Sequence, residues 1–292
     1  CPMASSAQRS NPMTDRIQLG IFGWPVAHSK SPQMHESAAR ALGLDLRYER
    51  FGVAPDALAE AVGDKHRAGI DGYNVTVPHK EAIMSLVDEV VPAARAIGAV
   101  NTVVRADGDY VGHNTDAPGF VRSLEEAGVP VEGARAVVLG AGGAARAAVV
   151  GLANAGAEEI TVLSRRPEQG EAVERSLGPL LATPLAAAPL GKAKGFFESA
   201  TLLVQATSAT LGSNPAAAEF AASLPVEALP EDAAVVDMVY EPLKTSLLER
   251  AESRGLVVVD GLGMLLHQGA IAFEMWTGLV PPLDVMRAAL ND

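Results

Sequence analysis

The sequence predicts an α/β protein of two domains: an N-terminal open, twisted, mostly parallel sheet and a second, doubly wound parallel sheet. Three observations support this class. Short runs rich in β-branched residues alternate with helical segments, and a glycine turn directly follows one such run near residue 140. The 292 residues also exceed the length at which one hydrophobic core usually divides. We therefore expect two folding units.

The charge and cysteine content exclude several classes of protein. With 35 acidic residues against 23 basic ones, the formal net charge is -12, and we find no Lys and Arg cluster that could neutralise a nucleic acid. An anionic ligand must therefore be held by a local basic site. The single cysteine, Cys1, excludes an internal disulfide framework, and the six histidines show no zinc-ligand spacing with cysteines. We expect no metal site.

The sequence also bears on location. No apolar run is long enough to span a membrane, and the opening residues lack the apolar stretch of a signal peptide. We expect a soluble, cytoplasmic protein with no membrane partner. Residues 1–15 are expected to be disordered or foreign to the natural chain, because terminal segments are often untethered.

The first expected strand covers residues 17–22, and a helix follows over residues 31–42. Ser31 is the predicted N-cap, because Pro32 comes next and proline suits the first helical position. Two interpretations of Ser29 and Ser31 stay open. They are simple capping residues, or their hydroxyls join the helix amides in binding a carboxylate.

We expect a strand over residues 46–51, a helix over residues 55–68 and a further strand over residues 72–77. The heptapeptide NVTVPHK begins in this further strand and continues past its end. Its valines alternate with polar residues, as in a half-buried strand, and Pro78 ends the strand. Lys80 then stands at the carboxyl end of a strand, where open α/β sheets bind ligands. It is either a solvated surface lysine or part of that site.

Residues 81–90 predict an amphipathic helix with its apolar side chains on one face. Next, strands over residues 102–105 and 110–113 predict a β-hairpin that turns at Asp107 and Gly108. Polar clusters flank this hairpin, namely Asn101 with Thr102, and Asn114 with Thr115 and Asp116. Each cluster is either turn chemistry or part of a functional site.

A strand over residues 134–139 leads at once into GAGGAAR, where Gly140, Gly142 and Ala145 fit the pattern G-x-G-x-x-[G/A]. Glycine permits a tight turn and a close backbone approach to a pyrophosphate at the start of the next helix. A further strand over residues 159–163 completes the order of a Rossmann-type dinucleotide-binding fold. A glycine-rich loop without a ligand is the alternative.

The residues after that further strand indicate which dinucleotide binds. They are Ser164, Arg165 and Arg166, and none is the carboxylate that would bind a ribose 2′-hydroxyl. Arginine offers planar donors that match a phosphate, so NADP is predicted rather than NAD. One of the two arginines is expected to be only a solvated charge.

The alternation continues to the end of the chain, with strands over residues 202–206, 235–239 and 256–259 and a helix over residues 244–253. Cofactor and substrate would meet at the carboxyl ends of these strands, where the sequence places Thr207, Ser208 and residues 238–240. The alanine-rich segment 180–188 is expected to be a connection. A final helix over residues 264–276 suits packing back onto the first domain. Gln268 within it would by itself be an exposed polar residue.

Taken together, these motifs resemble those of the shikimate dehydrogenases, a family that includes quinate/shikimate dehydrogenases. GWPVAHSKSPQMH is similar to the family's substrate-loop motif, NVTVPHK to its catalytic-lysine motif, and GAVNT and NTD to its next two motifs. GAGGAAR is similar to its cofactor turn. The resemblance runs in the family's order from residue 17 to residue 268 and beyond.

The resemblance implies the reversible, NADPH-dependent reduction of 3-dehydroshikimate to shikimate, in the pathway to aromatic amino acids. It implies that Lys80 is the catalytic base and that Asp116 pairs with it. The implied substrate contacts are Ser29 and Ser31 for the carboxylate, Thr76, Asn101, Asp116 and Gln268 for the ring hydroxyls, and Tyr240 nearby. The implied cofactor contacts are Gly140, Ala141, Gly142, Gly143 and Ala144 for the pyrophosphate, Ser164, Arg165 and Arg166 for the adenosine phosphate, and Met238 and Gly261 for the nicotinamide.

The chemistry of these side chains agrees with such roles. A polyhydroxy acid needs a fixed array of hydroxyl and amide partners, because a buried hydroxyl left unpaired costs about 1–3 kcal/mol. Oxidation of an alcohol also requires a group that accepts its proton. We expect residues 16–116 with 262–292 to bind the substrate and residues 117–261 to bind NADP, in a monomer or homodimer.

Two other functions stay open. The chain has Ser-Arg-Arg where the family usually has Asn-Arg-Thr, which leaves a quinate or quinate/shikimate dehydrogenase using NAD or NADP as an alternative. The other alternative is a non-catalytic, ligand-binding paralogue, whose sign would be the loss of Lys80 or Asp116, and both are present. Glu36 and Ala117 also depart from the family pattern, at positions expected to do no chemistry.

Overall fold

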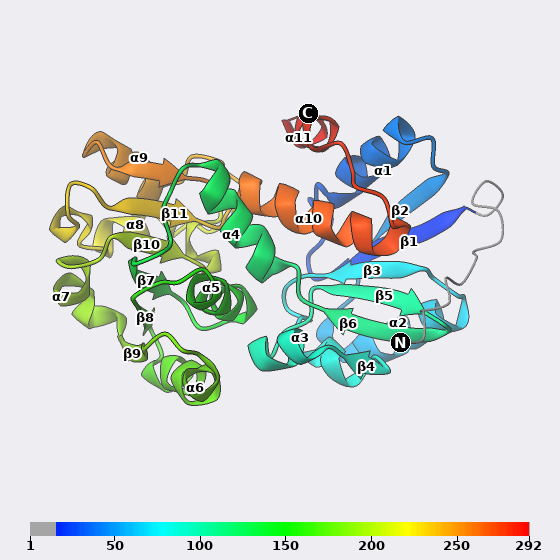
Figure 1. Cartoon of the computed structure of the whole chain (residues 1–292), viewed down its shortest axis with the longest axis horizontal. Coiled ribbons are helices and arrows are strands. Elements are labelled where there is room, and N and C mark those ends of the chain that lie inside the picture. Colours follow the sequence, from blue (N-terminus) through cyan, green and yellow to red (C-terminus); the bar gives the residue numbers. More distant parts are fainter. Residues whose placement is uncertain (1–15, 292) are drawn as a thin grey trace, which may run out of the picture.

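The computed structural model describes residues 16–291, which form two six-stranded sheets with helices around them (Figure 1). The expected disorder of residues 1–15 lies outside the described residues. The first half of the chain contains β1 (Ile17–Gly23), α1 (Ser31–Ala41), β2 (Leu46–Gly52), α2 (Leu58–Arg67), β3 (Gly72–Val75), β4 (Glu89–Val90), α3 (Pro92–Ile97), β5 (Thr102–Ala106) and β6 (Asp109–His113).

The second half alternates strands and helices, as expected. It contains α4 (Asp116–Glu126), β7 (Arg135–Leu139), α5 (Gly143–Asn154), β8 (Glu159–Ser164), α6 (Pro167–Leu177), β9 (Leu185–Pro189), α7 (Ala193–Phe197), β10 (Leu202–Gln205), α8 (Ala217–Ser223), β11 (Ala234–Asp237), α9 (Ser246–Ser253), β12 (Val257–Val259), α10 (Leu262–Thr277) and α11 (Leu283–Asn291). Short 3₁₀ turns at Pro55–Ala57, Ala82–Ser85, Gly178–Leu180, Leu190–Lys192, Ser208–Thr210 and Val226–Ala228 connect some of them.

The first sheet has the strand order β2-β1-β3-β5-β6-β4 and is mostly parallel, as predicted. Strands β1, β2 and β3 pair in parallel, while β5 pairs antiparallel with both β3 and β6. The β5–β6 hairpin turns at Asp107 and Gly108, which both have positive φ (53° and 101°). A two-residue turn of this kind needs both residues in the left-handed region, which explains the Asp-Gly pair.

The second sheet has the strand order β12-β11-β10-β7-β8-β9, and every pair in it is parallel. This is the doubly wound order of a Rossmann fold, in which the direction of winding reverses between β7 and β10. Crevices outside the strand ends at this reversal are where such sheets bind ligands. The fold class predicted from the sequence is therefore confirmed.

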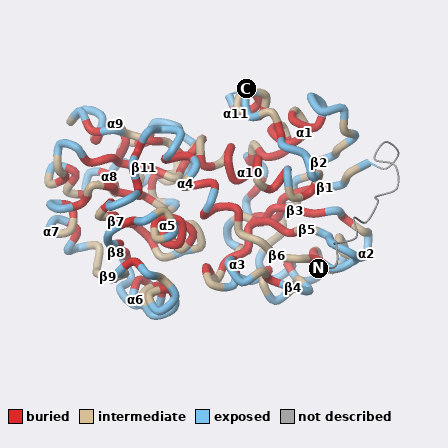
Figure 2. Tube along the Cα trace, viewed as in Figure 1, coloured by how far each residue is buried: buried red, intermediate tan, exposed pale blue. Residues whose placement is uncertain are grey.

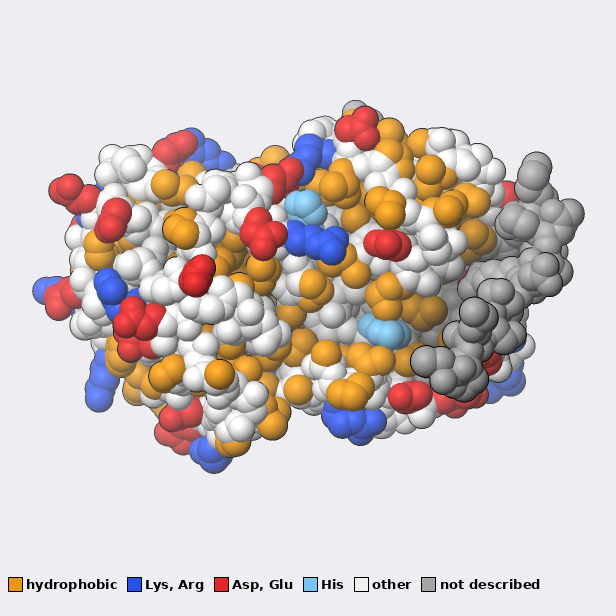
Figure 3. All heavy atoms as spheres, in the orientation of Figure 1, with side chains coloured by type: hydrophobic (Ala, Val, Ile, Leu, Met, Phe, Trp, Pro, Cys, Tyr) orange, Lys and Arg blue, Asp and Glu red, His pale blue; other side chains and the backbone are white. Residues whose placement is uncertain are grey.

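Each sheet is covered on both faces. In the second sheet one face packs against α4, α5 and α6 and the other against α7, α8 and α9. In the first sheet α2 covers one face, and α1, α10 and α11 lie on the other. Buried backbone accordingly runs through the central strands, α5 and α10 (Figure 2). Over one face of the molecule, acidic and basic side chains are scattered without a continuous basic patch (Figure 3).

Helices α4 and α10 lie side by side between the two sheets (Figure 1). Gly119 on α4 meets the backbone of Gln268 on α10, and a Cβ at Gly119 would lie 2.6 Å from the Gln268 nitrogen. At the far end of α10, Trp276 donates a hydrogen bond to the carbonyl of Val103 in β5 (2.9 Å). The expectation that the last long helix returns to the first sheet is therefore confirmed.

The predicted helix over residues 81–90 is wrong. The segment forms a 3₁₀ turn, Ala82–Ser85, and then β4, which pairs with β6. Asp88 accepts a hydrogen bond from the backbone nitrogen of Tyr110 (2.8 Å) and donates one from its own nitrogen to the Tyr110 carbonyl (2.9 Å). Pairing with a distant strand therefore replaces the local helical hydrogen bonds, although Ile83 is buried as expected.

Three further details differ from expectation. Strand β3 ends at Val75, and Val77 is exposed, because the chain turns away from the sheet before Pro78. The N-cap of α1 is Lys30, so Ser31 is the first helical residue. The alanine-rich segment 180–188 contributes β9, which pairs with β8 at the edge of the second sheet. Pairing along an exposed edge tolerates alanine, although alanine is a weak strand former.

Candidate active site

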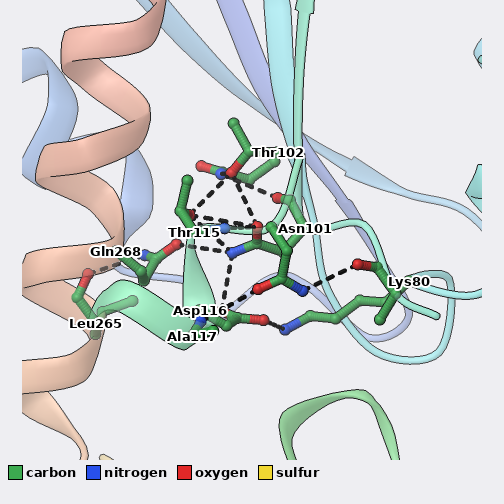
Figure 4. Close-up of polar contacts among 11 residues, drawn as sticks. Lys80, Asn101, Thr102, Thr115, Asp116, Ala117, Leu265 and Gln268 are labelled. Carbon is green, nitrogen blue, oxygen red and sulfur yellow. Dashed lines mark hydrogen bonds and ion pairs between the residues drawn. The ribbon is translucent and has the colours of Figure 1, made fainter. Parts of the chain in front are cut away.

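A polar cluster lies at the carboxyl end of β3, beside the first turn of α4 and the middle of α10 (Figure 4). It brings together four residues predicted from the sequence: Lys80, Asn101, Asp116 and Gln268. They come from the turn after β3, the residue before β5, the start of α4 and α10. Residues separated by up to 188 positions thus share one site.

Lys80 and Asp116 form a largely buried ion pair. The Lys80 Nζ lies 2.6 Å from Asp116 Oδ2, and the two side chains are only 15% and 5% exposed. The turn that presents the lysine is anchored by His79, whose ring contacts the Val53 carbonyl, and by the Lys80 carbonyl, which accepts from the Val100 nitrogen (2.8 Å). Breaking such a pair leaves one buried charge uncompensated, which costs about 3–5 kcal/mol.

Asn101 fixes the orientation of the Asp116 carboxylate. Its Nδ2 donates to Asp116 Oδ1 (2.8 Å) and to Thr115 Oγ1 (3.0 Å), and its Oδ1 accepts from the Thr115 nitrogen (2.7 Å). A third contact of Nδ2, to Gln268 Oε1, is longer at 3.3 Å. The Asn101 amide nitrogen has only two hydrogens, so two of these three oxygens share one hydrogen. A ligand hydroxyl can therefore supply the hydrogen bond that is missing.

Two further buried residues support the cluster: Asn74, which the sequence analysis noted in the heptapeptide NVTVPHK without a specific role, and Tyr48, which it did not single out. Tyr48 donates to Asn74 Oδ1 (2.6 Å), and Asn74 Nδ2 donates to the Asn101 carbonyl (3.1 Å) and to Thr102 Oγ1 (3.0 Å). Burial raises the pKa of Tyr48 well above its ordinary value, so the phenol stays a donor. An asparagine inside a strand that is buried on both faces was the available signal, because buried polar groups require partners.

The two predicted carboxylate contacts lie together at the start of α1. Ser29 and Ser31 are 9% and 3% exposed, their hydroxyls are 3.2 Å apart, and the Ser31 nitrogen donates to Ser29 Oγ (3.3 Å). Of the first three residues of α1, Ser31 donates its amide to Ser29 and Pro32 has no N–H, which leaves the Gln33 amide for an anion. Arg50 donates from Nε to the Ser29 carbonyl (3.0 Å), which holds this loop against β2.

Thr76 and Tyr240 occupy the carboxyl ends of two different sheets, after β3 and β11 respectively. Neither side chain hydrogen-bonds to the Lys80 cluster within residues 16–291. Burial raises the pKa of Tyr240, so its phenol stays protonated at neutral pH. Their contact with substrate therefore stays a prediction.

The glycine turn between β7 and α5 has the shape that a dinucleotide requires. Gly140 has φ +114°, and a Cβ there would lie 2.7 Å from Thr207 Cγ2. Gly142 has nothing within 4 Å of its Cβ position, so protein packing does not explain the glycine at this place. The α5 helix begins at Gly143 without a side-chain cap. Free amides and open space at a helix start fit a pyrophosphate.

The turn also lies next to Lys80. A Cβ added to Gly143 would be 3.5 Å from Lys80 Cδ, in ordinary contact. A few residues further along α5, Arg146 donates from Nε to the carbonyl of Ile97, at the end of α3. The start of α5 is therefore docked on the segment that leads into Asn101.

At the end of β8, Ser164 donates to the carbonyl of Arg166 (2.9 Å) and is itself buried. Its hydroxyl shapes the turn, while Arg165 and Arg166 are exposed. Met238 follows β11, and Gly261 packs so closely against the Met238 carbonyl that any side chain there would collide with it. These positions line the strand ends as predicted, and their contacts with cofactor stay a prediction.

The described residues contain neither a membrane-spanning helix nor a cluster of metal ligands. Within residues 16–291 no helix is both long enough and apolar enough to cross a membrane. In the same range no group of three or more His, Cys, Asp or Glu side chains could hold a metal ion.

A Rossmann sheet whose glycine turn lies next to a buried lysine–carboxylate pair is the arrangement of a dinucleotide-dependent oxidoreductase, a class that needs a titratable group near the bound dinucleotide. Comparison with known proteins narrows this class. The chain belongs to the shikimate dehydrogenase family.

The similarity extends over nearly the whole chain. The model of the shikimate dehydrogenase substrate binding domain matches residues 21–103, and that of the shikimate 5'-dehydrogenase C-terminal domain matches residues 261–290. A shikimate dehydrogenase (NADP(+)) of Symbiobacterium thermophilum is 46% identical over 278 residues, which are 93% of this chain and 92% of that protein.

Solved structures are also similar to this chain over nearly its whole length. The shikimate 5-dehydrogenase of Thermus thermophilus, in complex with NADP(H) and shikimate, is 41% identical with a TM-score of 0.81, covering 94% of this chain and 98% of that one. The quinate dehydrogenase of Corynebacterium glutamicum, in complex with NAD, is 30% identical with a TM-score of 0.86, covering 95% and 99%.

Proposed function

We propose that the protein is an NADP-dependent shikimate dehydrogenase that reversibly reduces 3-dehydroshikimate to shikimate in aromatic amino acid biosynthesis. The observation that carries the proposal is the Lys80–Asp116 pair at 2.6 Å, next to the glycine turn at Gly143. Relatives at about 45% identity over most of the chain are shikimate dehydrogenases (NADP(+)), and a similar structure holds NADP(H) and shikimate.

The bound cofactor supplies the hydride. During reduction the Lys80 ammonium gives a proton to the carbonyl oxygen of 3-dehydroshikimate, and during oxidation the neutral Lys80 amine accepts the hydroxyl proton of shikimate. Asp116 keeps the ammonium group in place, and Asn101 keeps Asp116 turned toward it. The Lys80 and Asp116 side chains are largely shielded from water, which strengthens their electrostatic contact.

The substrate is a hydroxy acid, and the site offers a partner for each of its groups. The hydroxyls of Ser29 and Ser31 and the Gln33 amide at the start of α1 bind the carboxylate. Asn101, Asp116, Gln268, Thr76 and Tyr240 face the ring hydroxyls. A ligand that lacked one of these hydroxyls would leave a buried partner unsatisfied, so the array also provides specificity.

The cofactor lies along the carboxyl edge of the second sheet. Gly140–Ala144 bind the pyrophosphate, Arg165 with Arg166 and Ser164 surround the 2′-phosphate, and Met238 with Gly261 adjoin the nicotinamide. Residues 16–116 with 262–292 form the substrate domain, and residues 117–261 form the NADP domain. The glycine at 142, which no packing contact requires, supports this placement.

One specific observation favours a second candidate, a quinate dehydrogenase. The NAD-bound quinate dehydrogenase has a TM-score of 0.86 with this chain, although its identity is only 30%. Initial rates at 340 nm with shikimate and quinate, each with NADP and NAD, decide between the two. Turnover confined largely to shikimate with NADP supports the proposal. Strong turnover of quinate or NAD favours the second candidate, and no turnover favours a non-catalytic paralogue.

A cytoplasmic location and a monomeric or homodimeric state complete the proposal. The single cysteine supports the location, because proteins of oxidising compartments commonly contain disulfides. Light scattering coupled to size exclusion measures the oligomeric state, and a tetramer would contradict it.

A further inference from the structure

A buried carboxylate lies in the second sheet, outside the groups proposed to bind substrate or cofactor. Asp237, the last residue of β11, is 0% exposed. Its Oδ1 accepts hydrogen bonds from the Val239 nitrogen and from Thr210 Oγ1 (both 3.1 Å), and its Oδ2 accepts from Thr245 Oγ1 (2.8 Å). One carboxylate thus joins three segments of chain.

All three partners are donors. Thr210 Oγ1 already accepts from Gln205 Nε2 (2.9 Å), and Thr245 Oγ1 already accepts from the Leu248 nitrogen (3.3 Å). Each hydroxyl therefore has its proton free for Asp237, and the Val239 amide can only donate. Such a set of donors matches an ionised carboxylate, which accepts at both oxygens, and matches an amide poorly.

The first pair of contacts shapes the loop after β11. Val239 and Thr245 are tied to the same carboxylate, so the chain between them, which includes Tyr240, is closed into a fixed loop. Met238 precedes this loop, and Gly261 packs against the Met238–Val239 peptide while its nitrogen donates to the Val239 carbonyl (3.2 Å). Because α10 starts at the next residue, the loop also supports the helix that carries Gln268.

The remaining contact of Asp237, with Thr210, leads to the loop after β10. Gln205, held by Thr210, accepts at Oε1 from both the nitrogen (2.9 Å) and the hydroxyl (2.8 Å) of Thr207. Thr207 in turn lies against Gly140, where a Cβ would be 2.7 Å from Thr207 Cγ2. A continuous series of buried and half-buried contacts therefore runs from Asp237 to the glycine turn.

We propose that Asp237 is a positioning residue for the reaction: it holds the loop of Met238 and Tyr240 and the loop of Thr207 in one arrangement around the reacting ends of cofactor and substrate. The inference rests on the proposed function. Asp237 itself touches neither ligand, and its effect passes through Thr245, Thr210 and Gln205.

Thr210 offers the sharpest test, because its hydroxyl can be removed without changing its shape. Thr210→Val should lower kcat/KM for shikimate at saturating NADP about tenfold or more, since small displacements in a reacting pair are costly. Thr210→Ser keeps the hydroxyl and should stay within about twofold of the original protein. Thermal unfolding of each variant separates loss of positioning from loss of folding.

Thr183→Val is the matched control. Thr183 is 8% exposed and donates to the Ala157 carbonyl (3.1 Å); the two residues precede β9 and β8, so they lie at the opposite edge of the second sheet from the glycine turn. It should lower the melting temperature about as much as Thr210→Val while leaving kcat and KM unchanged. Thr210→Val with kcat/KM within about twofold of the original would overturn the proposal.

Asp237→Asn tests the carboxylate directly and should lose activity in the same way as Thr210→Val. If this variant does not fold, Thr210→Val and its controls decide. NADP affinity by calorimetry separates this inference from the proposed function. If the original protein does not turn over shikimate, that function fails. Weaker NADP binding in Thr210→Val than in Thr183→Val would then still support the positioning role, and equal binding would overturn it.

Discussion

Asn101 donates a hydrogen bond from Nδ2 to Oδ1 of Asp116, 2.8 Å away, and so turns the other carboxylate oxygen toward Lys80. The two residues come from the segment before β5 and the first turn of α4, which the hairpin brings together. Asp116 therefore holds the Lys80 side chain, and Asn101 holds the Asp116 carboxylate. This arrangement makes the role of Lys80 testable.

Replacing Lys80 with Ala should lower kcat by a factor on the order of 100 or more with little change in KM, because the group that transfers the proton is lost while the hydroxyl and amide contacts remain. Steady-state kinetics with shikimate and NADP measure this. Lys65→Ala, which removes a partly exposed lysine on α2, is the control and should leave kcat unchanged. An unchanged kcat in Lys80→Ala would contradict the assignment.

Arg165→Ala should raise KM for NADP about tenfold or more and leave KM for NAD nearly unchanged, because only NADP carries the phosphate that the guanidinium would bind. The comparison requires KM for both cofactors with the same substrate. Arg175, an exposed arginine on α6 that pairs with Glu171, supplies the control Arg175→Ala. An equal effect on both cofactors would show that Arg165 does not read the phosphate.

Gly119→Ala tests the contact between α4 and α10. The new Cβ would lie 2.6–2.8 Å from the backbone and Cβ of Gln268, so the two helices must separate. We expect a loss of about 1–3 kcal/mol in unfolding free energy and a lower kcat/KM for shikimate, since Asp116 and Gln268 lie on these helices.

The control for this change is Gly63→Ala in α2. A Cβ there meets only the flexible end of Arg67, so the unfolding free energy should stay the same or rise by up to about 1 kcal/mol. Urea unfolding of both variants gives the comparison. Equal stability of Gly119→Ala and the original protein would mean that the helices are not held at this contact.

His35 makes stability depend on pH. It is 0% exposed, stacks on Tyr48 with ring centroids 4.8 Å apart, and neither ring nitrogen has a hydrogen-bond partner among the described residues. Burial lowers the pKa of His35 from 6.5 to about 3. Between these two values the unfolded chain binds a proton that the folded protein does not bind. The contribution to stability is therefore complete above pH 6.5 and is lost progressively as pH falls toward 3.

The slope from this residue approaches about 1.4 kcal/mol per pH unit within the window. His35→Phe keeps a ring in the stack and removes the titration, so the variant should gain stability relative to the original protein as the solution is acidified from neutral pH to about pH 4. Urea unfolding at several pH values measures the difference. His28→Phe, at an exposed position of the same segment, is the control. Parallel stability curves for His35→Phe and the original protein would contradict the prediction.

Local sequence was sufficient to predict most elements of the second sheet. Apart from the alanine-rich β9, its strands are short and contain β-branched residues, and they alternate with helices in a way that leaves few other topologies. The glycine turn at residues 140–142 was also predictable, because its glycines have the spacing of a dinucleotide-binding turn, and the positive φ at Gly140 favours glycine. These features depend on backbone conformation and period, which neighbouring residues largely set.

The alternation of strands and helices predicted the fold class, and short motifs predicted the family and most of the polar residues at the site. Which of these residues meet depends on the packing of distant segments. The sheet order places Lys80, Asn101 and Asp116 at one edge, and the crossing of α4 and α10 adds Gln268. The same non-local forces replaced the helix expected over residues 81–90 with β4. Contacts between distant segments depend on packing and on strand register, and the periodicity within one segment does not predict either.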